Sequence, residues 1–195
     1  MRVIDISQEL LSAKVYEGDP TPHIDRLQSM EKGDLYNLSS LSLCLHNGTH
    51  IDAPSHFIRD GKTVGEIPLS TFVGECYVAE HKGKVSATDA REILESAKAL
   101  GAGERILLKG DLTVTEEAAK AFADGGILLL GNESQSIGPE DAPMAVHLEL
   151  LSKGIILLEG IVLTDAKEGK YLLNAAPLKI NGAEGSPCRA WLMEM

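Results

Sequence analysis

The sequence predicts an α/β fold, in which a mixed sheet is packed against helices. Short runs rich in leucine and β-branched residues recur along the chain, as expected for strands. The N-terminal third is strand-rich, whereas the remainder alternates between helix-like and strand-like segments, an order typical of helices packed on a mixed sheet. The chain has 195 residues and no low-complexity linker, so we expect a single domain over residues 1–195.

Local patterns predict the individual elements. Strands are predicted at residues 3–6, 41–45, 76–79, 105–108, 127–130 and 155–163. Helices are predicted at residues 89–100, 116–123 and 142–153. Ser86 and Asp89 form a capping pattern before the first helix. Glycines suited to a left-handed C-terminal cap follow the three helices, at Gly101, Gly125 and Gly154.

The composition excludes several classes of partner. The formal net charge is −11, so neither nucleic acid nor an anionic membrane is an expected partner. The longest apolar runs, such as residues 154–162, are shorter than the roughly 20 residues that span a bilayer. Three widely spaced cysteines form neither a CxxC pair nor a disulfide framework, and the N-terminus lacks a signal-peptide pattern. We therefore expect a cytoplasmic protein that acts on a small molecule.

Three of the six histidines lie within residues 46–56, with Asp52 between them. In the segment before this cluster, apolar residues alternate with small or polar ones, which predicts that His46 ends a strand on the face opposite the leucines. Asn47-Gly48 then favours a turn. The spacing of His46 and His50 also occurs in helical zinc proteases, but the Asn-Gly pair disfavours a helix here.

The residues after this turn favour a set of ligands carried by a loop. His50 and Asp52 are two residues apart and point the same way if the backbone is extended. Pro54 excludes a helix around Asp52. Two imidazoles and a carboxylate suit zinc, manganese or another divalent first-row ion and leave positions open for water. The alternative is that His46, His50 and His56 are hydrogen-bonded loop residues and that Asp52 caps a turn. Four such residues are poorly explained as a chance cluster, which favours a metal site.

Two distant residues are candidates for the same site. Glu159 lies inside an apolar run, where a buried carboxylate is costly unless a cation compensates it. Its alternatives are an ion pair, for example with Arg189, or exposure at a strand end. His147 borders an apolar stripe of the third predicted helix, formed by Met144, Leu148 and Leu151, and is either a ligand or a structural residue.

The run from His46 to His56 resembles the signature His-x-Gly-Thr-His-x-Asp-x-Pro-x-His of the cyclase family, which includes the bacterial kynurenine formamidases, or arylformamidases. The resemblance covers nearly the whole chain, because further segments occur in family order: Gly18-Asp19, 156–160, 177–180 and 182–189. The chain departs from the formamidase pattern at Tyr16, where a tryptophan is usual, at residues 131–134, and at Val146, where a second histidine is common.

The resemblance implies a swivelling β/β/α-type domain that assembles as a homodimer or homotetramer, with N-terminal residues reaching the neighbouring subunit's site. It also implies one or two divalent ions per chain, zinc or manganese, and a proton-shuttling role for His56. One ion is then held by residues like His46, His50 and Asp52, and a second by residues like Asp52, His147 and Glu159. Tyr16 and Phe57 are candidate walls of the substrate pocket.

The expected reaction is hydrolysis of an amide bond, of the aryl formamide or cyclic amide class. A metal-bound hydroxide attacks the carbonyl, and His56 accepts a proton and returns it to the leaving nitrogen. A metal-dependent lyase or isomerase and a non-catalytic metal-binding protein remain alternatives on sequence alone. A cysteine hydrolase that uses Cys44 beside His46 is disfavoured, because Cys44 follows an apolar strand rather than the start of a helix.

Overall fold

The computed structural model describes residues 1–139 and 142–195. Its centre is a nine-stranded sheet in the order β1-β13-β11-β5-β7-β9-β10-β4-β12. These strands are β1 (Val3–Asp5), β4 (His50–Asp52), β5 (Val73–Glu80), β7 (Arg105–Lys109), β9 (Leu129–Asn132), β10 (Ile156–Glu159), β11 (Gly169–Asn174), β12 (Gly185–Pro187) and β13 (Trp191–Glu194). The middle strands β5, β7, β9 and β10 are parallel, and the outer strands pair antiparallel. The predicted mixed α/β architecture is therefore confirmed.

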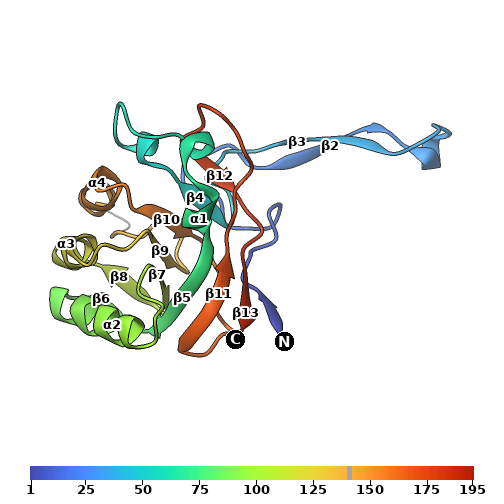
Figure 1. The fold of residues 1–195 in the computed structure, drawn as a ribbon. Coiled ribbons are helices and arrows are strands. Elements are labelled where there is room, and N and C mark those ends of the chain that lie inside the picture. Colours follow the sequence, from blue (N-terminus) through green and yellow to red (C-terminus); the bar gives the residue numbers. More distant parts are fainter. Residues whose placement is uncertain (140–141) are drawn as a thin grey trace.

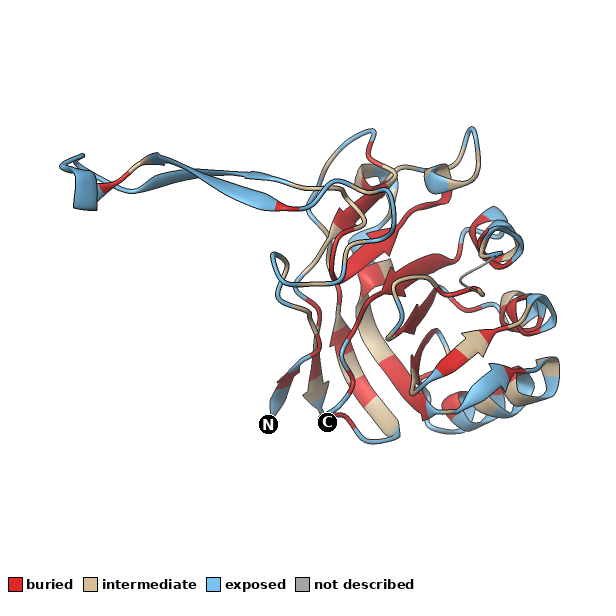
Figure 2. Ribbon diagram, turned by 180° about the vertical axis from the view of Figure 1, so that it is seen from behind, coloured by how far each residue is buried: buried red, intermediate tan, exposed pale blue. Residues whose placement is uncertain are grey.

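Three helices cover one face of this sheet, α2 (Ala87–Ala99), α3 (Glu116–Asp124) and α4 (Met144–Ser152) (Figure 1). Alternation along β7 shows why both faces are buried. Ile106 and Leu108 belong to the apolar cluster beneath the helices, whereas Leu107 belongs to the cluster on the opposite face. A strand that buries side chains on both faces reads as a continuous apolar run, and Figure 2 shows the buried residues concentrated in these central strands.

The predicted helix ends are confirmed except at one glycine. Ser86 and Asp89 form the expected capping box before α2. Gly101 and Gly154 are left-handed, with φ of 71° and 76°. Gly125 is not left-handed, with φ of −69°, and the next residue, Gly126, takes the positive φ of 73°. The prediction at Gly125 was wrong by one residue because either of two adjacent glycines can end the helix.

The smaller elements lie outside the main sheet. They are the pair β6 (Gly83–Val85) and β8 (Leu112–Val114), the short helix α1 (Leu69–Phe72) and the 3₁₀ turns Met30–Lys32, Pro54–His56 and Val64–Glu66. No helix among the described residues is long and apolar enough to cross a membrane.

A two-stranded arm projects from the body of the molecule (Figure 1). It consists of β2 (His23–Gln28) and β3 (Leu38–Ser42), which pair antiparallel. The predicted strand at 41–45 overlaps only the end of β3. Of the leucines that suggested a buried face there, Leu41 is 49% exposed, and Leu43 and Leu45 are only partly buried.

Candidate metal centre

The structure brings all five predicted ligands together. His46, His50 and Asp52 form one group, and Asp52, His147 and Glu159 form a second, with the potential ligand atoms of each group within 4.8 Å of one another. Asp52 belongs to both groups. Because its two oxygens face different histidines, a single carboxylate is placed to serve two ions.

Strand pairing places three of these residues on one face of the sheet. His50 and Asp52 are two residues apart on β4, so their side chains point the same way. Glu159 on β10 is the direct partner of His50 in the antiparallel register. The intervening residue Ile51 points to the opposite face and packs in the apolar cluster there. The predicted extended backbone at His50 and Asp52 is therefore a sheet strand and not a loop.

His46 reaches the site from a turn, so the prediction that it ends a strand was wrong. β3 ends at Ser42, and Asn47 closes a turn onto Cys44 with both its backbone N–H (3.1 Å) and its side-chain oxygen (2.8 Å). The tight turn outweighs the alternating pattern because Asn and Gly satisfy the backbone locally. In this position Nδ1 of His46 lies 2.7 Å from Oδ1 of Asp52.

His147 reaches the site from the first turns of α4. Its Nε2 lies 3.3 Å from Oε1 of Glu159 and 3.7 Å from Oδ2 of Asp52. The predicted apolar stripe of this helix was right at Leu151 and wrong at Met144 and Leu148, which are exposed. The buried face comprises Val146, His147, Leu150 and Leu151. Most residues of this helix are apolar, so their spacing alone could not show which face packs into the core.

Backbone carbonyls orient two of the histidines. Nδ1 of His50 lies 3.0 Å from the carbonyl oxygen of Gly48, and Nδ1 of His147 lies 2.8 Å from that of Pro143. In the neutral form of each ring Nδ1 is then the donor, and Nε2 faces the carboxylates, where it can bind a cation or take up a proton. Metal-binding histidines are commonly held in this way by a second partner on the outer nitrogen.

The site concentrates negative charge in the protein interior. Asp52 and Glu159 are 1% and 2% exposed. Within the described part of the chain, their ion-pair partners are histidines only. Arg189, the alternative partner considered for Glu159, instead donates to Asp5 at 2.9 Å. Two buried carboxylates facing imidazoles form a donor set that fits a divalent cation.

The shifted pKa values of the site residues reflect the same concentration of buried negative charge. Burial disfavours the charged form of His50, but the carboxylates of Asp52 and Glu159 outweigh it and raise its pKa to about 10. Burial is likewise outweighed at His147, where Glu159 raises the pKa, and at Asp52, where His46 and His50 lower it. Without a cation, protonated histidines neutralise part of the charge of the two buried carboxylates.

His56 lies at the edge of the two groups and is more accessible than the ligands. Its side chain is 30% exposed, and its Nε2 is 3.9 Å from Oδ2 of Asp52. The ring stacks on His46 with centroids 4.1 Å apart. Burial lowers the pKa of His56, so the imidazole is neutral near pH 7 and able to accept a proton.

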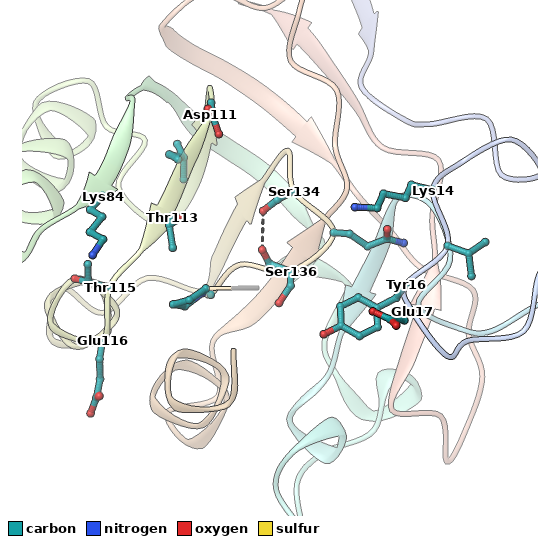
Figure 3. A pocket seen from close by; sticks show the side chains of 15 residues that line it. Lys14, Tyr16, Glu17, Lys84, Asp111, Thr113, Thr115, Glu116, Ser134 and Ser136 are labelled. Atoms are coloured by element: carbon teal, nitrogen blue, oxygen red, sulfur yellow. Dashed lines mark hydrogen bonds between the residues drawn. The ribbon is translucent and has the colours of Figure 1, made fainter. Parts of the chain in front are cut away.

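The two predicted wall residues lie in different places. The ring of Phe57 packs against His56 and His147, with centroid distances of 4.6 and 4.8 Å. Tyr16 instead lines a cavity of about 1110 Å³ that none of the predicted ligands lines. Figure 3 shows Lys14 and Tyr16 on one side of this cavity, Lys84 and Glu116 on the other, and the hydrogen-bonded Ser134 and Ser136 between them.

One acidic residue beside the site was missed by sequence reasoning. Oε1 of Glu184 lies 3.6 Å from Nε2 of His46. Glu184 falls within the C-terminal family-like segment, but its neighbours Ala183 and Gly185 form no ligand pattern with it. Only the pairing of β12 with β4 brings it close to His46.

Comparisons with known proteins agree with this geometry. The Cyclase family model matches residues 4–139. Kynurenine formamidases of Erythrobacter litoralis (strain HTCC2594) and Salinibacter ruber (strain DSM 13855 / M31) are 31% and 33% identical to the whole chain, which covers 94% and 98% of them. A solved structure of a potential metal-dependent hydrolase with cyclase activity is 29% identical, with a TM-score of 0.79 over 98% of this chain and 96% of that one. The fold, the arrangement of His46, His50 and Asp52, and these matches together show that the chain belongs to the cyclase family.

Proposed function

We propose that the protein is a metal-dependent hydrolase of an amide bond, of the aryl formamide or cyclic amide class. The observation that carries the proposal is Asp52, which is shared by two buried His-carboxylate groups beside the accessible His56. The relatives named kynurenine formamidase and the similar solved structure of a metal-dependent hydrolase support this class of reaction.

His46, His50 and Asp52 hold one divalent ion in this proposal, and Asp52, His147 and Glu159 hold a second. Imidazole nitrogens together with carboxylate oxygens favour zinc or manganese over calcium or magnesium. When bound, such an ion acidifies water and stabilises negative charge on the carbonyl oxygen. Occupancy is therefore one or two ions per chain.

The chain's own residues handle the proton and position the substrate. His56 accepts a proton from the attacking water and donates it to the leaving nitrogen, a double role that suits a neutral, partly exposed imidazole. Phe57 holds the ring of His56 by edge contact and offers an apolar wall beside it. An aryl group fits against such a wall. Tyr16, which lines a separate cavity, is proposed as a second substrate contact.

Hydrolysis is tested with purified protein loaded with zinc or manganese and incubated with a panel of N-formylanilines and cyclic amides in H₂¹⁸O. The proposal predicts one ¹⁸O atom in the carboxylate product, with turnover abolished by a chelator and restored by adding the ion back. Turnover without ¹⁸O incorporation would instead show a lyase or isomerase. No turnover of any amide by the metal-loaded protein would contradict the proposed class.

We further propose that the protein is a cytoplasmic homodimer or homotetramer and that residues 1–195 form a single domain. The arm supports assembly, because an isolated two-stranded hairpin is marginal in water, and it exposes Ile24 (50%), Leu27 (58%) and Leu35 (95%). Light scattering after size exclusion should give a mass two or four times that of the chain. Replacing Leu27 and Leu35 with Ser should shift the protein toward monomer.

A further inference from the structure

We propose that Glu184 is a positioning residue, which orients His46 for metal binding by accepting a hydrogen bond from its outer nitrogen. This inference rests on the proposed metal centre and concerns a residue outside the two ligand groups. It starts from a difference among the three histidine ligands. His50 and His147 each have Nδ1 fixed by a backbone carbonyl, whereas the outer nitrogen of His46 makes no hydrogen bond within the part of the chain described here.

That outer nitrogen is Nε2, because Nδ1 of His46 faces Asp52 at 2.7 Å. Nε2 is buried, and a buried N–H without an acceptor is destabilising. Oε1 of Glu184 faces it at 3.6 Å, slightly longer than a hydrogen bond. The Glu184 side chain is 44% exposed and is therefore free to close this gap by rotation.

The backbone around Glu184 is fixed against the ligand strand. The carbonyl oxygen of Glu184 accepts from Ala53 N–H at 2.8 Å, and Gly185 is the direct partner of Asp52 in the β12–β4 register. Gly185 also makes room for the ring, since a Cβ there would lie 2.6 Å from Cε1 of His46. Residues 184 and 185 thus form a wall on which the His46 imidazole rests, with the carboxylate as its polar contact.

The consequence is that Glu184 selects the tautomer of His46. With Nε2–H directed at Glu184, Nδ1 presents its lone pair toward Asp52, where the ion shared with His50 would lie. Loss of such an outer partner typically weakens metal binding by about 10- to 100-fold. The effect should be confined to the ion held by His46, because Glu184 contacts none of the other ligands among the described residues.

The test is calorimetric titration of zinc or manganese into chelator-stripped wild type, Glu184→Ala and Glu184→Gln, with Glu92→Gln as a matched control on the exposed face of α2. We expect Glu184→Ala to weaken one equivalent of metal by about 10- to 100-fold and leave any second equivalent unchanged. Glu184→Gln should stay within a few-fold of wild type, since its amide oxygen still accepts the hydrogen bond. Glu92→Gln should match wild type.

Two further readouts separate positioning from a structural effect. In zinc-loaded protein, the Nε2–H proton of His46 in long-range ¹H–¹⁵N spectra should exchange slowly with water in wild type and faster in Glu184→Ala, at unchanged unfolding temperature. Adding Glu184→Ala to His46→Ala should cause no further loss of affinity. Wild-type affinity for all equivalents in Glu184→Ala would overturn the inference while leaving the metal centre intact, whereas no metal binding by wild type would overturn both.

Discussion

His50 and Glu159 are direct partners across β4 and β10, and this pairing places Nε2 of His50 3.4 Å from Oε2 of Glu159. The two residues are more than a hundred positions apart in sequence. The antiparallel pairing of β4 with β10 therefore brings the histidines and Asp52 of residues 46–56 next to the carboxylate of Glu159. Asp52, two residues beyond His50, lies on the same face, so the sheet itself fixes three of the five proposed ligands.

This pairing predicts the effect of Glu159→Gln. The substitution keeps the shape of the side chain but removes the charge that faces His50 and His147. We expect loss of the ion held with His147 and retention of the ion held with His46. Metal content measured by elemental analysis should therefore fall by one equivalent in a protein that binds two. Unchanged stoichiometry and affinity would exclude Glu159 as a ligand.

Removing the imidazole of His56 should separate catalysis from metal binding. Because His56 lies at the accessible edge of the site, His56→Ala should keep its metal content while its turnover number falls by about 10²- to 10⁴-fold, the range for loss of general acid-base catalysis. The test is to measure kcat and metal content in the same preparation of the variant. Full activity in His56→Ala would rule out the proton-shuttle role.

The metal-free protein should lose stability as the pH rises. The folded-state pKa of His50 is raised to about 10, above the ordinary histidine value of about 6.5. Its protonated form therefore stabilises the fold fully below about pH 6.5, and this contribution is lost as pH increases through about 10. The raised pKa of His147 acts in the same direction.

Urea unfolding of chelator-stripped protein should accordingly give a free energy lower by a few kcal/mol at about pH 9.5 than at about pH 7. Protein loaded with metal should show a smaller change, since its ligands are already deprotonated. A metal-free protein equally stable at both values would show that the histidines do not carry these protons.

The cysteines should be inert and dispensable for turnover. Burial raises the pKa of Cys76 and of Cys188 to about 12, and it also raises the pKa of Cys44. Since the thiolate is the reactive form, alkylation by iodoacetamide at neutral pH should be slow for all three. Activity should survive treatment, and Cys44→Ser should retain it. Rapid inactivation with modification of Cys44 would revive the cysteine hydrolase alternative.

The sequence predicted the parts of this site that depend on local pattern. His50 and Asp52 lie two apart before a proline, so their common direction follows from strand geometry. Glu159 was a candidate because a carboxylate in an apolar run needs a partner, although residue pattern alone left Arg189 as one alternative. The resemblance to the cyclase family, and not periodicity, selected His147 and Glu159 together.

What the sequence could not predict depends on contacts between distant segments. Glu184 approaches His46 only through the pairing of β12 with β4. The buried face of α4 is the one that packs into the apolar cluster beneath the helices, through Val146, Leu150 and Leu151. Met144 and Leu148 are exposed despite their spacing. Most of the arm escaped prediction, because β2 and β3 are exposed along their length and no buried face imposes an apolar pattern on them. Only the end of β3 overlaps the strand predicted at 41–45.

Metal stoichiometry in wild type and Asp52→Ala tests the central claim most directly. Protein purified without chelator or affinity metal should contain one to two equivalents of zinc or manganese by elemental analysis. Asp52→Ala should contain almost none, because Asp52 belongs to both ligand groups, and Glu92→Gln should match wild type. Equal metal content in wild type and Asp52→Ala, or no binding by either in excess zinc and manganese, would contradict a metal centre built around Asp52.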